Sequence, residues 1–118
     1  MPQHIDDPRR LTQAVLQIID LLGLYRAELA RILHFRCGDI GELAAARRCL
    51  EPGTDAWVQA QRFLRGYRAL FARMHGDGVA MRHWLRVQQP GLGGVPHLLM
   101  VDDDRLDAVV DYLENSVS

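Results

Sequence analysis

Residues 54–75 read TDAWVQAQRFLRGYRALFARMH, and this stretch has the clearest helical pattern in the 118-residue chain. Its apolar residues recur three or four positions apart, as expected for a helix that packs one face on a core. These positions are Trp57, Ala60, Phe63, Leu64, Tyr67, Leu70, Phe71 and Met74. The opposite face carries Arg62, Arg65, Arg68 and Arg73. Because Thr54 is a typical N-cap residue, the stretch predicts a long amphipathic helix that begins there.

The segment before residue 54 predicts three more helices. Asp7–Pro8 combines an N-cap acceptor with a proline at the first helical position, and Gly23 supplies a left-handed stop. A second helix is expected over about residues 26–34. A third is expected to run from residue 38 to the Pro–Gly pair at 52–53.

The expected third helix begins with acidic residues. Asp39 and, three positions later, Glu42 form a capping-box pattern. The residues expected on its inward face are Ile40, Leu43, Ala44, Arg47 and Leu50. The helix is therefore expected to be acidic at its start and basic only toward its end, at Arg47 and Arg48.

The segment after residue 75 predicts shorter helices. One is expected over about residues 79–86, followed by a glycine- and proline-rich loop, a single turn over 96–100 and a closing helix. The aspartates at 102–104 suit the N-terminus of that last helix, where negative charge is stabilised by the helix dipole. Its expected buried stripe is Leu106, Val109, Val110 and Leu113. Since no segment alternates with the period of a strand, the expected fold class is all-α, a compact multi-helix domain.

Charge is unevenly distributed along a chain whose net charge is only −1. Residues 24–75 hold nine arginines against five acids, and residues 76–118 hold three arginines against seven acids. The apolar runs are far shorter than the roughly 20 residues that cross a bilayer, and the N-terminus lacks a signal-peptide pattern. A cytoplasmic protein without membrane contact is expected, with Cys37 and Cys49 as free thiols.

Signals for catalysis are weak. His34, Cys37 and Cys49 do not match a common zinc-ligand spacing, and 102–104 lacks the pattern of a calcium loop. Gly91–Gly94 follows no strand and lacks the lysine of a phosphate-binding loop. We therefore expect a protein that is not an enzyme and that uses no metal and no cofactor.

The expected second and third helices resemble a helix-turn-helix unit. The small Ala30 would let the two helices pack closely, as such units require. Arg36, Arg47 and Arg48 are the candidate DNA-binding residues, but the carboxylates at the start of the third helix would oppose phosphates. Two interpretations remain: a pair of packed core helices, or a DNA-binding unit.

The C-terminal third resembles the toxin-binding domain of the Xre/MbcA/ParS antitoxin family. The resemblance is carried, in order, by Trp84, Leu85, Pro90, Leu92, Gly93, Gly94 and Pro96, followed by Leu98–Leu99 and a closing helix. Gln89 and Gly91 stand where that family usually has asparagine and alanine. The resemblance implies a helix-turn-helix-like region over residues 1–75 and a toxin-binding-like region over residues 76–118, forming one compact unit.

The resemblance also implies a function. It implies an antitoxin-like protein that dimerises and neutralises a partner toxin, for example a RES-type toxin that consumes NAD. The candidate partner-facing residues are Asp107, Asp111, Tyr112 and Glu114. The alternatives are a helix-turn-helix regulator that binds DNA, and a solitary relative that serves as an adaptor for an unrelated protein.

Overall fold

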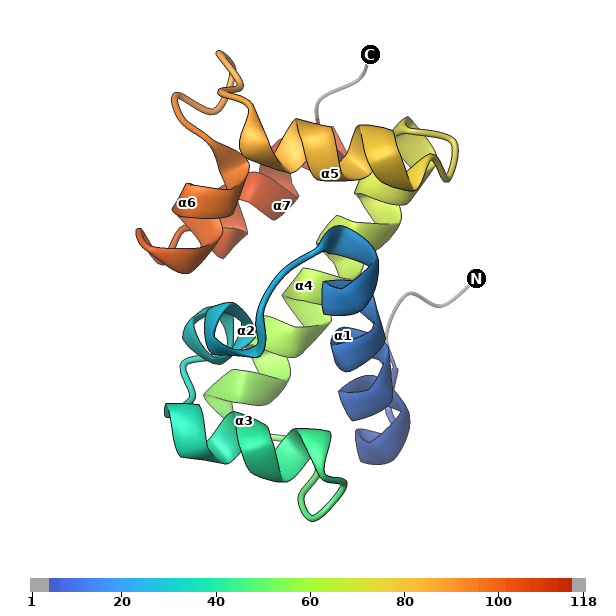
Figure 1. The fold of residues 1–118 in the computed structure, drawn as a ribbon, viewed down its shortest axis with the longest axis vertical. Coiled ribbons are helices and arrows are strands. Elements are labelled where there is room, and N and C mark those ends of the chain that lie inside the picture. The colour runs from blue at the N-terminus through green and yellow to red at the C-terminus, as the bar shows by residue number, and fades with distance from the viewer. Residues whose placement is uncertain (1–4, 116–118) are drawn as a thin grey trace.

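The structure is a computed structural model that describes residues 5–115, and those residues form seven α-helices and no β-strand (Figure 1). This confirms the predicted all-α fold class. The helices are α1 (Pro8–Leu22), α2 (Arg26–Ile32), α3 (Cys37–Ala44), α4 (Asp55–Arg73), α5 (Gly78–Arg86), α6 (Pro96–Val101) and α7 (Leu106–Asn115).

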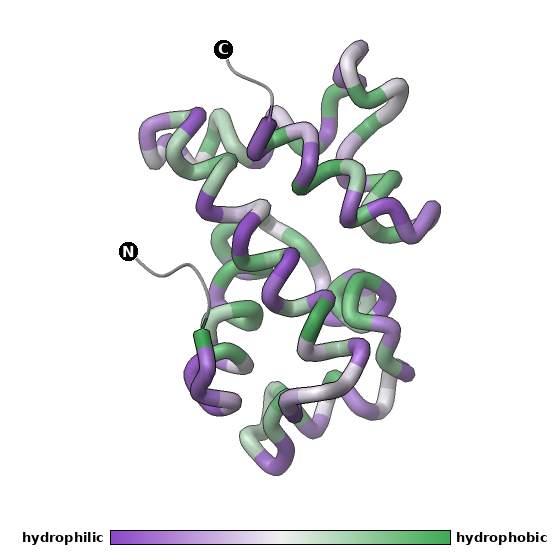
Figure 2. The backbone as a smooth tube through the Cα atoms, turned by 180° about the vertical axis from the view of Figure 1, so that it is seen from behind, coloured by the Kyte–Doolittle hydropathy of each residue, from purple (hydrophilic) through white to green (hydrophobic). Residues whose placement is uncertain are grey.

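Helix α4 lies at the centre, with α1 to α3 around one half of it and α5 to α7 around the other (Figure 1). The Thr54 hydroxyl accepts a hydrogen bond from the Trp57 N–H at 3.2 Å, which confirms the predicted N-cap. Hydrophilic and hydrophobic residues alternate along its turns (Figure 2). Phe71, predicted to face the core, is instead 47% exposed, because its ring packs on the turn at Gly76, beyond the core.

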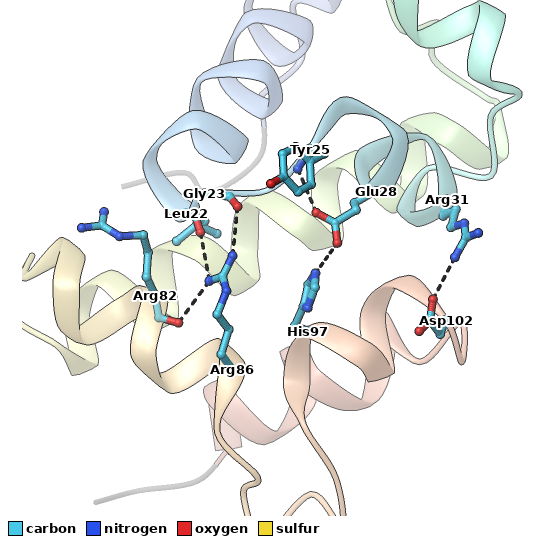
Figure 3. Close-up of polar contacts among 9 residues, drawn as sticks. All are labelled: Leu22, Gly23, Tyr25, Glu28, Arg31, Arg82, Arg86, His97 and Asp102. Carbon is cyan, nitrogen blue, oxygen red and sulfur yellow. Dashed lines mark hydrogen bonds and ion pairs between the residues drawn. The ribbon is translucent and has the colours of Figure 1, made fainter.

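The two ends of α1 form as predicted. The Asp7 carboxylate accepts a hydrogen bond from the Arg9 N–H at 3.0 Å, and Gly23 adopts a left-handed φ of 71°. Arg86 of α5 then donates to the carbonyl oxygens of Leu22 and Gly23, at 3.4 and 2.9 Å (Figure 3). Cations suit the negative end of a helix dipole, so this contact fastens α5 to the C-terminus of α1.

Helix α3 departs most from the prediction. The helix begins at Cys37, and Arg36 is its N-cap residue. Asp39 is the third residue of the helix and not its N-cap, and its carboxylate accepts a hydrogen bond from the Arg36 N–H at 3.4 Å. It ends at Ala44 instead of near residue 52, because Ala46 adopts a left-handed φ of 61°. Arg47, predicted to face inward, is consequently exposed. Helix α2 similarly ends at Ile32, two residues earlier than expected.

The aspartates at 102–104 do not begin α7, contrary to the prediction. Asp102 is the C-cap of α6, and Asp104 has a left-handed φ of 54°. Helix α7 begins only at Leu106, and the acid in its first turn is Asp107. The reason is tertiary: Asp102 and Asp104 form ion pairs with side chains of the α2 region.

Candidate protein-interaction surface

The loop of residues 87–95, between α5 and α6, projects from the body of the molecule (Figure 1). Its own backbone holds its shape. The Gln89 N–H donates to the Gly94 carbonyl at 2.9 Å, and the Gln89 carbonyl accepts from Leu92 at 2.9 Å and from Gly93 at 3.0 Å. Gly93 has a φ of 74°, which explains why glycine occupies this position. The loop is therefore a folded turn with a defined surface.

Two aromatic rings support the base of the loop. Trp84 is only 7% exposed, and its ring stacks on that of Tyr112 with 6.3 Å between centroids. A Cβ atom added at Gly91 would lie 2.5 Å from the Tyr112 ring, so the loop backbone presses directly on that ring. The Arg73 guanidinium lies 5.5 Å from the same ring centroid. Tyr112, predicted to face a partner, is thus half-buried and supports the loop.

Of the other residues that carry the resemblance to the antitoxin family, some are buried and some are exposed. Leu85 and Pro96 are buried in the core, and Leu92 is partly buried against it. Pro90 is exposed in the loop. Gly94 faces Leu99, because a Cβ atom there would meet the leucine side chain at 3.4 Å. These residues therefore serve mainly to shape the loop, and they contribute few exposed side chains.

The acidic face of α7 lies beside the arginine row of α4. Glu114 accepts from the Arg65 guanidinium through both carboxylate oxygens, with 3.0 Å between Nε and Oε2. This bidentate contact raises the pKa of Arg65 above its ordinary value. Asp107 and Asp111 are exposed, and neither forms an ion pair with another residue in the range 5–115. Asp107 and Asp111 therefore differ from Glu114 in having no ion-pair partner among the described residues, although the Asp111 carboxylate accepts a hydrogen bond from the Asn115 side chain.

Side chains of the α2 region join those of the C-terminal part in a network that sequence reasoning missed. Glu28 pairs with His97, and Arg31 pairs with Asp102 at 2.8 Å (Figure 3). The partners lie about 70 positions apart, at separations of 69 and 71 residues, so no local pattern signals them.

A third link in this network is His34, which lies in the turn after α2. Its Nε2 atom meets the Asp104 carboxylate at 2.6 Å, and its Nδ1 atom contacts Asp55 at the start of α4. Only the doubly protonated ring can donate to both carboxylates. The hydrogen bonds to Asp104 and then to Asp55 raise the pKa of His34 above 6.5, against a smaller lowering by burial.

We expect stability to fall as the pH rises through the folded-state pKa of His34. The raised pKa means that the contribution is fully present below the unfolded value of 6.5 and is lost above the folded value. The change should stay below about 1 kcal/mol, because the side chain is 36% exposed and solvent screens the pairs. The pH dependence of the free energy of unfolding is measured by urea unfolding of the wild type and of His34→Gln at acidic to alkaline pH. The exposed His83→Gln serves as the control, and parallel pH profiles for wild type and His34→Gln would contradict the expectation.

The candidate DNA-binding residues lie around α3, which follows α2 after a turn over residues 33–36. Arg36 is exposed at the start of α3. Arg47 pairs with Glu42 at 3.7 Å, and Arg48 pairs with Asp39 at 3.0 Å. Asp39 in the first turn of α3 and Glu42 further along it thus pair with the arginines that follow the helix, and the helix itself carries no basic side chain.

Comparisons with known proteins identify no family for this chain. No family model matches it, and no curated protein matches it. Within residues 5–115, no helix is both long enough and apolar enough to cross a membrane. The same residues contain no group of three or more histidine, cysteine, aspartate or glutamate side chains that could hold a metal ion.

Proposed function

We propose that the protein is an antitoxin-like interaction module that binds and neutralises a partner toxin through its C-terminal region. The observation that carries this proposal is the exposed loop of residues 87–95, held by backbone hydrogen bonds on the Trp84–Tyr112 pair. A preformed surface loses little conformational entropy on binding, so it suits recognition of a protein. The same residues carry the resemblance to the antitoxin family.

Charge on α7 indicates the chemistry of the partner. Asp107 and Asp111 present carboxylates to solvent one turn apart on the same helix. They suit a partner with a basic surface, such as the entrance of a pocket that holds phosphate groups. A RES-type toxin fits this description, because its substrate, NAD, carries phosphate groups. A cytoplasmic homodimer is part of the same proposal.

The alternative of DNA binding has less support from the geometry. The order of α2, turn and α3 suits a helix-turn-helix unit. However, Arg47 and Arg48 pair with acids of α3, and a phosphate backbone would have to compete with those carboxylates. An adaptor for a partner other than a toxin would use the same C-terminal surface, and only the identity of the partner separates it from an antitoxin.

A charge reversal on α7 tests the proposal. We expect Asp107→Arg/Asp111→Arg to lower toxin affinity by at least about tenfold, because two attractive contacts become repulsive. Glu114 stays unchanged, because reversing it would also break the contact with Arg65. The protein is co-expressed with the product of a neighbouring toxin-sized reading frame, and rescue of growth and affinity are measured.

The matched control for this test is Asp20→Arg, which reverses an exposed acid on α1. It should neutralise the toxin as the wild type does. The circular dichroism spectra of the wild type, the α7 double variant and Asp20→Arg should be the same. Full neutralisation by the α7 variant would overturn the role of its charge, and failure of the wild type to neutralise would overturn the antitoxin proposal.

A further inference from the structure

A groove of about 480 Å³ lies between α1 and the segment that follows α3. The first turns of α1 and this segment lie at the opposite end of the molecule from the loop of residues 87–95 (Figure 1). Its volume falls in the range of about 300–1,000 Å³ that is typical of ligand-binding sites. Arg9, Gln13 and Leu16 form one wall, and they lie on one stripe of α1. The other wall is formed by the last turn of α3 and the segment after it, through Leu43, Ala44, Ala46, Arg48 and Cys49.

The early end of α3 creates this groove. Ala46, with its left-handed φ of 61°, turns the chain away from the helix axis. The Leu50 N–H then donates to the Thr12 hydroxyl at 2.9 Å, which ties the returning segment to α1. The groove is therefore bounded by hydrogen-bonded backbone. Its floor is apolar, since it is lined by the buried Leu43 and the partly buried Leu16.

Each wall of the groove carries an arginine, but of these two only Arg9 is unpaired in the range that the structure describes. Arg48 is held in position by Asp39 at 3.0 Å and by the Phe35 ring, whose centroid lies 5.5 Å from the guanidinium carbon. The Arg9 side chain, on the opposite wall, has no hydrogen-bond or ion-pair partner within the described part of the chain. Among residues 5–115, no aspartate or glutamate lines the groove.

We propose that this groove binds an acidic peptide segment of a protein partner. A carboxylate of the peptide pairs with Arg9, whose guanidinium is not already paired with a described residue, and an aliphatic side chain of the peptide covers the partly buried Leu16. A nucleic acid fits less well, because it needs a row of unpaired cations, whereas Arg48 is paired with Asp39 and only Arg9 lacks a partner within the described residues. This site goes beyond the proposed C-terminal surface, and its position at the other end of the molecule lets one protein hold two partners.

The experiment selects ligands from a displayed library of random short peptides on the full-length protein. We expect the selected peptides to combine aspartate or glutamate with leucine, isoleucine, valine or phenylalanine. On binding, they should shift the NMR resonances of Gln13, Leu16 and Ala46. Arg9→Glu should lower their affinity by at least about tenfold, because a charge-assisted contact becomes repulsive. Gln13→Glu, which retains Arg9, should lower the affinity less but in the same direction.

The control is Arg10→Glu, which makes the same change of charge in the same turn of α1 at an exposed residue outside the groove. It should retain wild-type affinity. The proposal is overturned if selection yields no saturable ligand, or if the selected peptides lack acidic residues. It is equally overturned if Arg9→Glu and Arg10→Glu lose affinity alike, or if the shifted resonances map to the loop of residues 87–95. Preferential binding of duplex DNA in this groove would overturn it in favour of nucleic acid.

Discussion

Replacing Trp84 with alanine is expected to destabilise the fold by about 3–5 kcal/mol, the usual cost of removing a large buried aromatic side chain. The side chain is only 7% exposed, and its ring stacks on that of Tyr112. A domain of this kind has a total stability of about 5–15 kcal/mol, so the loss takes a large share of it. Urea unfolding followed by circular dichroism measures the change in free energy of unfolding.

The same substitution should also affect function. Tyr112 supports the loop of residues 87–95 by contact with Gly91, and Trp84 supports Tyr112 in turn. Under conditions where Trp84→Ala remains folded, we therefore expect loss of partner binding as well.

Tyr25→Ala is the matched aromatic control for Trp84→Ala, because Tyr25 is 76% exposed. Its stability should stay within about 0.5 kcal/mol of the wild type. If Trp84→Ala lost no more stability than this control, the tryptophan would not be the anchor of the C-terminal part.

The second large effect is expected where α4 meets α7. Gly66 is buried there, and a Cβ atom added to it would lie 3.0 Å from a methyl group of Val110. Gly66→Leu should destabilise the protein by about 2–3 kcal/mol, because a leucine forces the two helices apart. This loss exceeds the gain of about 1 kcal/mol that replacing a glycine brings to a helix interior. Thermal and urea unfolding measure the loss of stability in Gly66→Leu.

Gly41→Leu is the control for this substitution. Gly41 is also helical, but a Cβ atom there would meet nothing within 4 Å. The control should therefore gain stability or leave it unchanged. Equal losses in the two variants would show that the close approach of α4 and α7 is not what requires glycine at position 66.

Local signals were sufficient to predict most of the helices. Asp7, Gly23 and Thr54 act on atoms within a few residues of themselves, so their effects as caps and stops could be predicted. The spacing of apolar residues predicted the buried stripes of α4 and α7 in the same way.

Other features could not be predicted from short segments. Ala46 ends α3 in a left-handed conformation that alanine seldom adopts, so no residue type marks the end of that helix. The binding groove depends on that ending. Similarly, Glu114 pairs with Arg65, a residue 49 positions away, and no local pattern signals that pair.

The all-α class, the starts of α1 and α4, and the glycines that shape the loop of residues 87–95 follow from local sequence, because caps, periodicity and positive φ act over a few residues. The use of the charges depends on how the helices pack. Packing places Asp102 beside Arg31 of α2 and Asp104 beside His34 in the turn after α2, and it leaves Asp107 and Asp111 exposed. An ion pair needs two groups within about 4 Å in space, whatever their separation along the chain, so the packing of the helices selects which acids remain free to bind.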